Sequence, residues 1–173
     1  MTIADVLAGR AEWAIEQCDV RAGLAAMPEH SVHLVCTSPA YWALRSYKAG
    51  PDELGSEPQH DCRAWARGEL PCGTCWVCNL RMVAGGRDRP EGVWRALRDD
   101  GLAVIVVGDT YVAVRSYQVP DGKWRPVGNE SAMHGVPGLR DKSLCLNPQR
   151  LALALQADGW IVRSVMPWLK RNC

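Results

Sequence analysis

The run Ser38-Pro39-Ala40-Tyr41 could carry chemistry because of its place in the chain. One residue, Thr37, separates it from the apolar stretch VHLVC (32–36), which has the pattern of a buried parallel strand. In open α/β sheets, ligands bind outside the carboxyl ends of the strands. A hydroxyl, a proline and an aromatic ring at this place therefore indicate a binding or catalytic site. The structural alternative is a strand followed by a turn, in which the ring only packs against its neighbours.

Four cysteines between positions 62 and 78 are the second group that could carry chemistry. Cys72, Cys75 and Cys78 follow one another at intervals of three residues, and Cys62 precedes them. Their thiolates could hold one tetrahedral structural zinc ion, and His60 could replace one of them. In a segment with little apolar content, such a metal would supply order that packing cannot. Free thiols and an iron–sulfur cluster are the alternatives.

The same region also matches half of the signature of zinc-dependent nucleobase deaminases, Pro-Cys-x-x-Cys, at residues 71–75. The other half, His-x-Glu, is missing, because no glutamate stands two residues after His30, His33 or His60. A deaminase is therefore not expected.

The elements that must position these groups alternate between strand and helix. Apolar runs predict strands at 14–20, 32–36, 102–109 and 160–168. Helices are predicted at 20–31, stopped by Pro28, and at 148–158, with shorter helical pieces within 76–101. Asn147 is the expected N-cap of the later helix, and Gly159 its end. This alternation predicts a doubly wound α/β sheet, with Asp19 and residues 108–111 as further site candidates at strand ends.

The chain is long enough for one domain with a hydrophobic core, and its net charge of +1 neither favours nor excludes nucleic-acid binding. No apolar run approaches the ~18 residues of a membrane-spanning helix. The N-terminal segment also lacks the apolar core of a signal peptide. We therefore expect a cytoplasmic protein without membrane contact, in which the eight cysteines do not form a disulfide framework.

With its flanks, the run TSPAYW (37–42) resembles the TSPPYW motif of the permuted (β-class-like) DNA amino-methyltransferases. The segment 18–35 looks like the family's lead-in to this motif. Later segments look like family segments in the same order, at 44–47, 101–111, 150–164 and 168–172. The resemblance implies an α/β fold with a Rossmann-like S-adenosylmethionine-dependent methyltransferase sheet, incomplete at the C-terminus, and a Cys-rich insertion.

The resemblance also implies roles for the motif residues. An exocyclic amino group is a poor nucleophile because its lone pair is delocalised into the ring, and acceptors for its hydrogens free that pair. In the family, the side chain at the Ser38 position and the backbone carbonyl of Pro39 are these acceptors. The ring at Tyr41 stacks on a base flipped out of the duplex. Ala40 replaces the family's second proline, so we expect a looser acceptor and weaker catalysis.

Further contacts follow from the same resemblance. Asp19 is expected near the adenine of S-adenosylmethionine, with a solvated turn aspartate as the alternative. Asp109 is expected to line the same cofactor cleft together with Tyr111, with a helix cap as the alternative. The expected substrate-binding residues are Trp42, Arg45, Tyr111 and Lys170. The two basic residues among them would meet phosphates of double-stranded DNA, unless they serve only solubility.

No Phe-x-Gly-x-Gly motif, which holds the methionine part of the cofactor in the family, follows the catalytic motif. We therefore expect residues 1–173 to form one partial catalytic domain, with residues 48–92 as a loop or insertion that contains the zinc clip. Alone, it should bind S-adenosylmethionine weakly or not at all. Either a second chain supplies the C-terminal cofactor-binding half, or the protein is an inactive, zinc-stabilised remnant that binds DNA or a partner chain.

The expected function is site-specific DNA methylation of restriction–modification or phage type. Ser38 slightly favours cytosine N4 over adenine N6 as the target. The transfer is direct and needs no cysteine nucleophile, so Cys36 is expected in the core. The missing strands predict an open sheet edge and exposed apolar surface.

Overall fold

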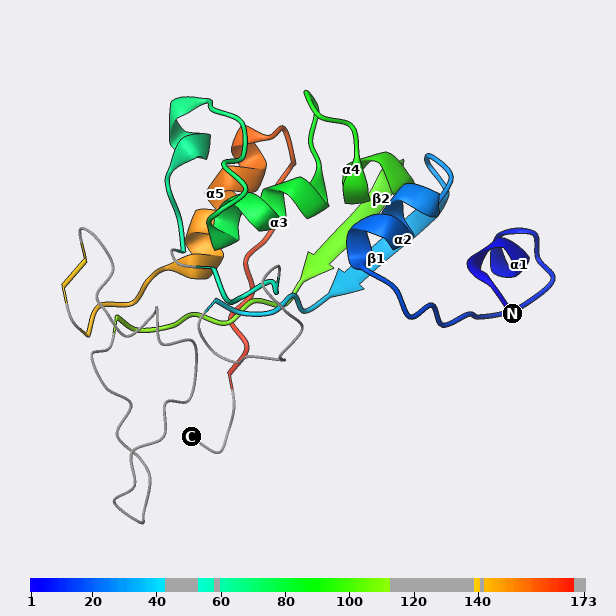
Figure 1. The fold of residues 1–173 in the computed structure, drawn as a ribbon, viewed down its shortest axis with the longest axis horizontal. Coiled ribbons are helices and arrows are strands. Elements are labelled where there is room, and N and C mark those ends of the chain that lie inside the picture. The colour runs from blue at the N-terminus through cyan, green and yellow to red at the C-terminus, as the bar shows by residue number, and fades with distance from the viewer. Residues whose placement is uncertain (43–52, 58–59, 113–138, 141, 170–173) are drawn as a thin grey trace, which may run out of the picture.

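The computed structural model describes residues 1–42, 53–57, 60–112, 139–140 and 142–169, and Arg45 and Lys170 lie outside these ranges. The helices are α1 (Ile3–Leu7), α2 (Val20–Ala26), η1 (Ala64–Arg67), α3 (Trp76–Ala84), α4 (Gly92–Ala96) and α5 (Asn147–Ala157). The strands are β1 (Val32–Thr37) and β2 (Leu97–Ile105). Figure 1 shows α2 and α4 beside the strands, α3 and α5 as a second group, and α1 apart from both.

The two strands form a parallel sheet, so their carboxyl ends lie at the same edge. Leu34 pairs with Leu102 and Thr37 with Ile105, after an irregularity in the register near Val32. The pairing continues past β2, where the Val106 amide donates to the Thr37 carbonyl at 2.9 Å. A mixed helix–strand fold with a small parallel sheet is in keeping with the predicted α/β class. The Rossmann-like assignment stays a prediction.

The hydrophobic core lies between α3 and α5 rather than on the sheet. Its fully buried side chains include Trp76 and Val77 of α3, and Leu151 and Leu155 of α5 pack against them. The core also takes in Trp42, Ala64 and Val112. The segment 48–92 is predicted as a loop or insertion with little apolar content and with helical pieces from residue 76. Its described residues include η1, α3 and several core side chains. Its buried apolar side chains come mainly from η1 and α3, and both elements pack against α5.

A buried ion pair joins these two helices. Arg81 of α3 donates to both carboxylate oxygens of Asp158 at the end of α5, at 2.8 and 2.6 Å. The guanidinium also donates to the Glu69 carbonyl. Because Arg81 is only 3% exposed, these contacts take the place of water around its guanidinium.

Two predicted strands are absent from the described structure. Residues 14–19 run without a strand partner into α2, and residues 160–169 form no regular element. Ile161 and Trp168 are 85% and 79% exposed. An isolated extended segment cannot satisfy its backbone groups within the protein, so an apolar pattern alone does not make a strand.

Smaller differences concern element ends. β2 covers 97–105 rather than 102–109, and α2 ends at Ala26, before Pro28. Leu146, in the left-handed region with φ of 58°, holds the N-cap position of α5 that was predicted for Asn147. Asn147 is instead the first helical residue, and its carboxamide donates to Thr110 Oγ1 at 3.0 Å.

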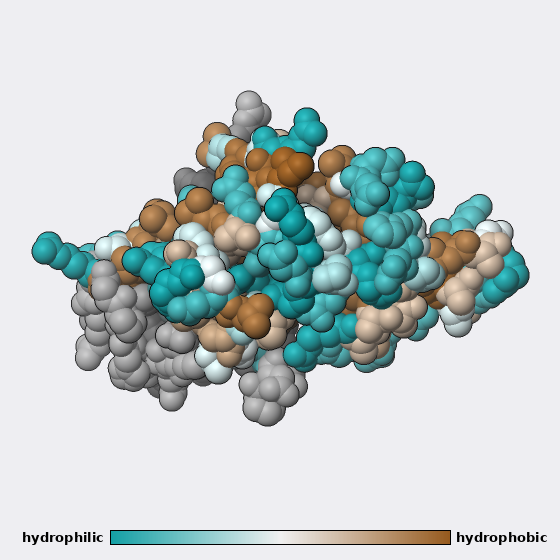
Figure 2. Space-filling model, turned by 90° about the horizontal axis from the view of Figure 1, so that it is seen from above, coloured by the Kyte–Doolittle hydropathy of each residue, from teal (hydrophilic) through white to brown (hydrophobic). Residues whose placement is uncertain are grey.

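The sheet is open to solvent in the described structure, in keeping with the predicted exposed apolar surface. Leu34 of β1 and Leu102 of β2 are 55% and 57% exposed. Cys36, expected in the core, is exposed as well. Apolar side chains reach the surface at several places in the view of Figure 2. Within the described part, no helix is long and apolar enough to cross a membrane.

Candidate active site and cysteine cluster

The predicted catalytic run lies in the loop that leaves β1. The Ser38 hydroxyl and the Tyr41 hydroxyl are 3.1 Å apart and hydrogen-bonded to each other. The Tyr41 ring lies against Gly108, where an added Cβ would come within 2.7 Å of ring atoms Cδ2 and Cε2. Because β1 and β2 are parallel, their ends bring these two loops together. Gly108 is the residue type that lets the ring approach the backbone so closely.

Ala40 is held by residues distant in the sequence. Its carbonyl accepts a hydrogen bond from the indole Nε1 of Trp76 at 2.8 Å. Gly55, with φ of +94°, packs against the same residue, and a Cβ there would lie 3.2 Å from the Ala40 Cβ. The preceding carbonyl, that of Pro39, has no hydrogen-bond donor among the described residues. Its role as the acceptor that the resemblance assigns to it stays a prediction.

Trp42, predicted to contact the substrate, is packed in the core. It is 3% exposed, and its indole nitrogen donates to the Glu57 carbonyl at 2.9 Å. Its ring lies 5.3 Å from that of His60, centre to centre. A contact between this ring and DNA would require Trp42 to leave the core. In the structure, Trp42 instead anchors the end of the motif loop.

The two acidic candidates both cap helices. Asp19 is the N-cap of α2, where its carboxylate accepts from the Arg21 amide at 2.9 Å and pairs with the Arg21 guanidinium. That guanidinium, together with the amide, lowers the pKa of Asp19. Asp109 accepts from the amides of Leu146 and Asn147 at 3.1 and 3.0 Å. Asp109 thus caps the start of α5, which was its alternative predicted role. A contact with the cofactor stays a prediction.

Tyr111 lies two residues beyond Asp109 and is exposed. It forms an isolated antiparallel bridge with Leu144. The contact between Tyr41 and Gly108 brings the motif loop and residues 108–109 together at one edge of the sheet. Asp19 and Tyr111 are exposed at the surface, and no contact joins them to the motif within the described structure.

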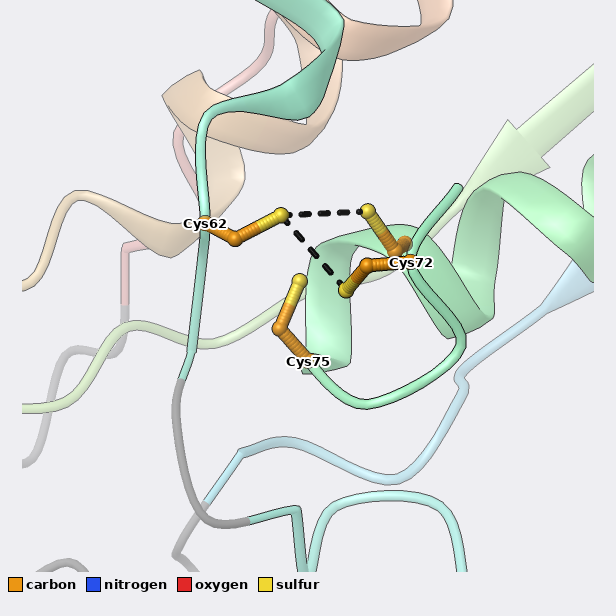
Figure 3. A group of neighbouring side chains, drawn as sticks. Cys62, Cys72 and Cys75 are labelled. Atoms are coloured by element: carbon orange, nitrogen blue, oxygen red, sulfur yellow. Dashed lines mark hydrogen bonds between the residues drawn. The ribbon is translucent and has the colours of Figure 1, made fainter. Parts of the chain in front are cut away.

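The four predicted cysteines converge on one point (Figure 3). Cys62 Sγ lies 3.5 Å from Cys72 Sγ and 3.6 Å from Cys78 Sγ, and all four sulfur atoms are within 4.8 Å of one another. Zinc–sulfur bonds of about 2.3 Å in a tetrahedron require sulfur–sulfur distances of about 3.8 Å. All four are free thiols. The set therefore has the chemistry and the spacing of a tetrahedral metal site.

The sulfur atoms come from separate parts of one segment. Cys62 precedes η1, Cys72 lies in the loop before α3, Cys75 is the N-cap of α3, and Cys78 lies in its first turn. The Cys75 thiol donates to Cys78 and lowers the pKa of Cys78 to about 5. His60 stays outside the group and packs against Trp42, and neither ring nitrogen is hydrogen-bonded to a described residue. The sequence predicted either four cysteines, or three cysteines and His60, as the metal ligands. The geometry fits the set of four cysteines.

Sequence reasoning missed the residues that hold the motif in place, namely Gly55, Glu57, Trp76 and Asn79. Trp76 and Ala40 are 36 residues apart, and no local pattern links them. The only available signal was a tryptophan directly after Cys75, within a helix rich in apolar residues.

Comparison with known proteins identifies similar chains. The Type II methyltransferase M.SfiI of Streptomyces fimbriatus is 35% identical over 149 residues, which are 86% of this chain and 28% of that protein. M.Cfr9I of Citrobacter freundii is 34% identical over 157 residues, 89% of this chain and 45% of that protein. M.XycI of Xanthomonas campestris pv. cyanopsidis is 36% identical over 151 residues, 86% of this chain and 43% of that protein.

This chain is similar to part of the Type II methyltransferases. It spans less than half of the length of each of these relatives. No protein-family model matches the chain, and no solved structure matches it. The similarity supports a methyltransferase, while the permuted class and the motif type stay predictions.

Proposed function

We propose that this chain is the part of a site-specific DNA methyltransferase that carries the catalytic motif. The target is an exocyclic amino group, with cytosine N4 slightly favoured over adenine N6. One observation carries the proposal: a chain similar to Type II methyltransferases over most of its length has the motif loop at the joint carboxyl ends of two parallel strands. In that loop, the Pro39 carbonyl has no donor among the described residues.

In the proposed reaction, a flipped base stacks on Tyr41 and places its amino group between Ser38 Oγ and the Pro39 carbonyl. To accept an amino hydrogen, Ser38 exchanges its hydrogen bond with the Tyr41 hydroxyl. These two acceptors favour a tetrahedral nitrogen, whose lone pair is then free to attack in line. S-adenosylmethionine, when bound, supplies the methyl group from a sulfonium that becomes a neutral thioether. The surplus proton leaves the nitrogen along its hydrogen bond to Ser38 and passes to solvent.

The cofactor site is proposed to be incomplete in this chain. Both carboxylate oxygens of Asp109 accept backbone amides at the start of α5, and Asp19 pairs with Arg21 at the surface. Neither arrangement forms an enclosed cofactor site. We therefore expect weak or no binding of S-adenosylmethionine to the isolated chain. Isothermal titration with the purified chain measures this, and low-micromolar affinity would contradict the expectation.

The rest of the enzyme is proposed to come from further polypeptide, as a second chain or as a continuation of this one. The relatives are more than twice as long as the part that this chain matches. The exposed side chains of Leu34 and Leu102 offer an apolar sheet face that additional elements could cover. A complete enzyme would bury this face and add the cofactor loop.

The cysteine cluster is proposed to bind one structural zinc ion through Cys62, Cys72, Cys75 and Cys78. The sulfur–sulfur distances support this assignment. Metal analysis of protein purified without chelator should find one zinc per chain, and Cys72→Ser should lower that content. The matched control is Cys36→Ser, because Cys36 is a free thiol outside the cluster. Protein without stoichiometric zinc would refute the assignment.

The methyltransferase proposal is tested by transfer of labelled methyl groups from S-adenosylmethionine to unmodified double-stranded DNA. The chain is assayed alone and together with the remaining part of a relative such as M.XycI. Label on cytosine N4 or adenine N6 that disappears in Ser38→Ala supports the proposal. DNA binding without any transfer in either assay would contradict it. That result would favour the second candidate, an inactive zinc-stabilised remnant, in which alanine stands at the position of the family's second proline.

A further inference from the structure

We propose that the cysteine cluster and the first turn of α3 form a clamp that positions the catalytic loop, with Trp76 as the positioning residue. The clamp replaces the stiffness that the loop lacks because residue 40 is alanine instead of proline. The catalytic part of this inference rests on the proposed methyltransferase function. Its structural part, the coupling between cluster and loop, does not.

The first link of the clamp is a single peptide bond. Cys75 contributes a sulfur atom to the cluster, and Trp76 follows it as the first residue of α3. Trp76 is fully buried, and its indole nitrogen donates to the Ala40 carbonyl at 2.8 Å. Any displacement of Cys75 therefore moves the donor that holds the motif loop.

The second link runs through Glu57. Its carboxylate accepts from Asn79 of α3 at 2.9 Å and from the Gly55 amide at 2.8 Å. Its backbone carbonyl accepts from the Trp42 indole at 2.9 Å. Glu57 thus connects the first turns of α3 to the end of the motif loop, and it is itself buried.

The third link runs through His60, two residues before the cluster cysteine Cys62. The Val77 amide of α3 donates to the His60 carbonyl at 2.9 Å, and the His60 ring packs against Trp42. Two sides of the motif are consequently fixed by one helical turn, at Ala40 and at Trp42. Between these two points lies Tyr41, the proposed base-stacking residue.

This arrangement explains how an alanine is compatible with an ordered acceptor. A proline at position 40 would fix φ of that residue and restrict Pro39 before it. Here the hydrogen bond from Trp76 and the packing of Gly55 restrict Ala40 from outside. The backbone of the motif is thus restricted by contacts with a neighbouring helix instead of by a proline ring of its own. The cluster that anchors this helix thereby becomes part of the catalytic apparatus.

The closing experiment is a double-variant cycle with Trp76→Phe and Ala40→Pro. Phenylalanine keeps an aromatic ring but lacks the indole donor. In the assay with the remaining part of a relative, methyl transfer should therefore fall about tenfold in kcat with little change in the KM for DNA. Ala40→Pro should restore most of this loss in the Trp76→Phe background. Equal effects of Ala40→Pro in both backgrounds would overturn the positioning role.

The matched control is Trp160→Phe. The Trp160 indole donates to the Gly85 carbonyl at 3.0 Å, so its replacement loses the same kind of hydrogen bond away from the motif. Its kcat should stay within about twofold of the wild type. If Trp160→Phe lowers kcat as much as Trp76→Phe, the loss reflects general destabilisation and the proposal fails.

A readout independent of activity uses the ¹⁵N-labelled indole resonance of Trp76, assigned by its absence in Trp76→Phe. This indole proton should be protected from solvent exchange in the metal-loaded protein and lose protection in Cys72→Ser or after chelation. Cys36→Ser should leave it unchanged. Unaltered protection after loss of the cluster would overturn the link to the metal site. Altered protection without any methyl transfer would uphold the clamp and refute only the methyltransferase function.

Discussion

At the scale of single residues, the two proposed acceptors of the motif differ in their hydrogen-bond partners. The Pro39 carbonyl has no donor among the described residues, whereas Ser38 Oγ is bonded to the Tyr41 hydroxyl at 3.1 Å. A base that stacks on Tyr41 can use the ring without the hydroxyl. In the proposed reaction, the hydroxyl holds Ser38 until the amino group of the base replaces it.

Two substitutions at Tyr41 separate these roles. Tyr41→Ala should weaken binding of the flipped base by about 1–3 kcal/mol, the range for stacking of one base on an aromatic side chain. Tyr41→Phe keeps the ring and frees Ser38, so methyl transfer should stay within a few-fold of the wild type. Fluorescence of 2-aminopurine at the target position reports the flipped base. Comparable losses in both variants would show that the hydroxyl, rather than the ring, matters.

Asp109 should contribute to stability independently of any cofactor. Replacement by alanine leaves the amides of Leu146, Asn147 and Thr110 without their acceptor. We expect a loss of about 0.5–2 kcal/mol in the free energy of unfolding, the range for losing a side-chain cap at the start of a helix. Asp88→Ala, at an exposed aspartate, is the control. Equal stability of both variants in urea unfolding would leave Asp109 without a structural role.

At the scale of elements, α3 has two functions at once. Its buried face forms the core with α5, and its N-terminal turn carries two cluster cysteines and the donor to the motif. A helix of nine residues would be marginal by itself. The position of α3 therefore depends on packing, on the cysteine cluster and on the ion pair with Asp158.

The ion pair of α3 provides a direct test of this dependence. Arg81→Ala leaves the carboxylate of Asp158 buried without its partner, so the free energy of unfolding should fall by about 3–5 kcal/mol. Arg98→Ala removes an exposed pair with Asp100, so its effect on stability should be much smaller. Thermal and chemical unfolding measure both. A small effect of Arg81→Ala would mean that α3 is held by packing alone.

At the scale of the whole molecule, the sheet and the core are separated. Helices α3 and α5 bury each other, while β1 and β2 keep exposed apolar side chains. A parallel sheet is ordinarily covered on both faces. The exposed apolar side chains and the greater length of the relatives both support the proposal that further polypeptide packs on the strands.

Leu102→Lys tests this view of the sheet. Because the side chain is 57% exposed, stability of the isolated chain should change by less than about 0.5 kcal/mol. Binding of the dye ANS and self-association should both decrease, since the apolar face is interrupted. Gln149→Lys, at an exposed position on α5, controls for the added charge. A large loss of stability would show that the sheet face is already covered.

The sequence by itself determined the features that depend on neighbours along the chain. The apolar run before Ser38 became β1, the pattern after Pro148 became α5, and the cysteine spacing produced one cluster. Periodicity, helix-compatible residues and short loops act over a few residues, so they can be recognised without a structure. The order of the motif segments also sufficed to recognise the methyltransferase resemblance.

Only the tertiary structure decided the features that depend on distant partners. The Trp76 indole reaches Ala40 across 36 residues, and Asp109 caps a helix that begins 38 residues later. The run 160–168 has a strand pattern but no strand to pair with in the described structure. A hydrogen bond or a sheet partner requires both groups in place, and their separation along the chain is not encoded in either local pattern. For that reason, the anchoring of the motif by α3 became visible only in the folded chain.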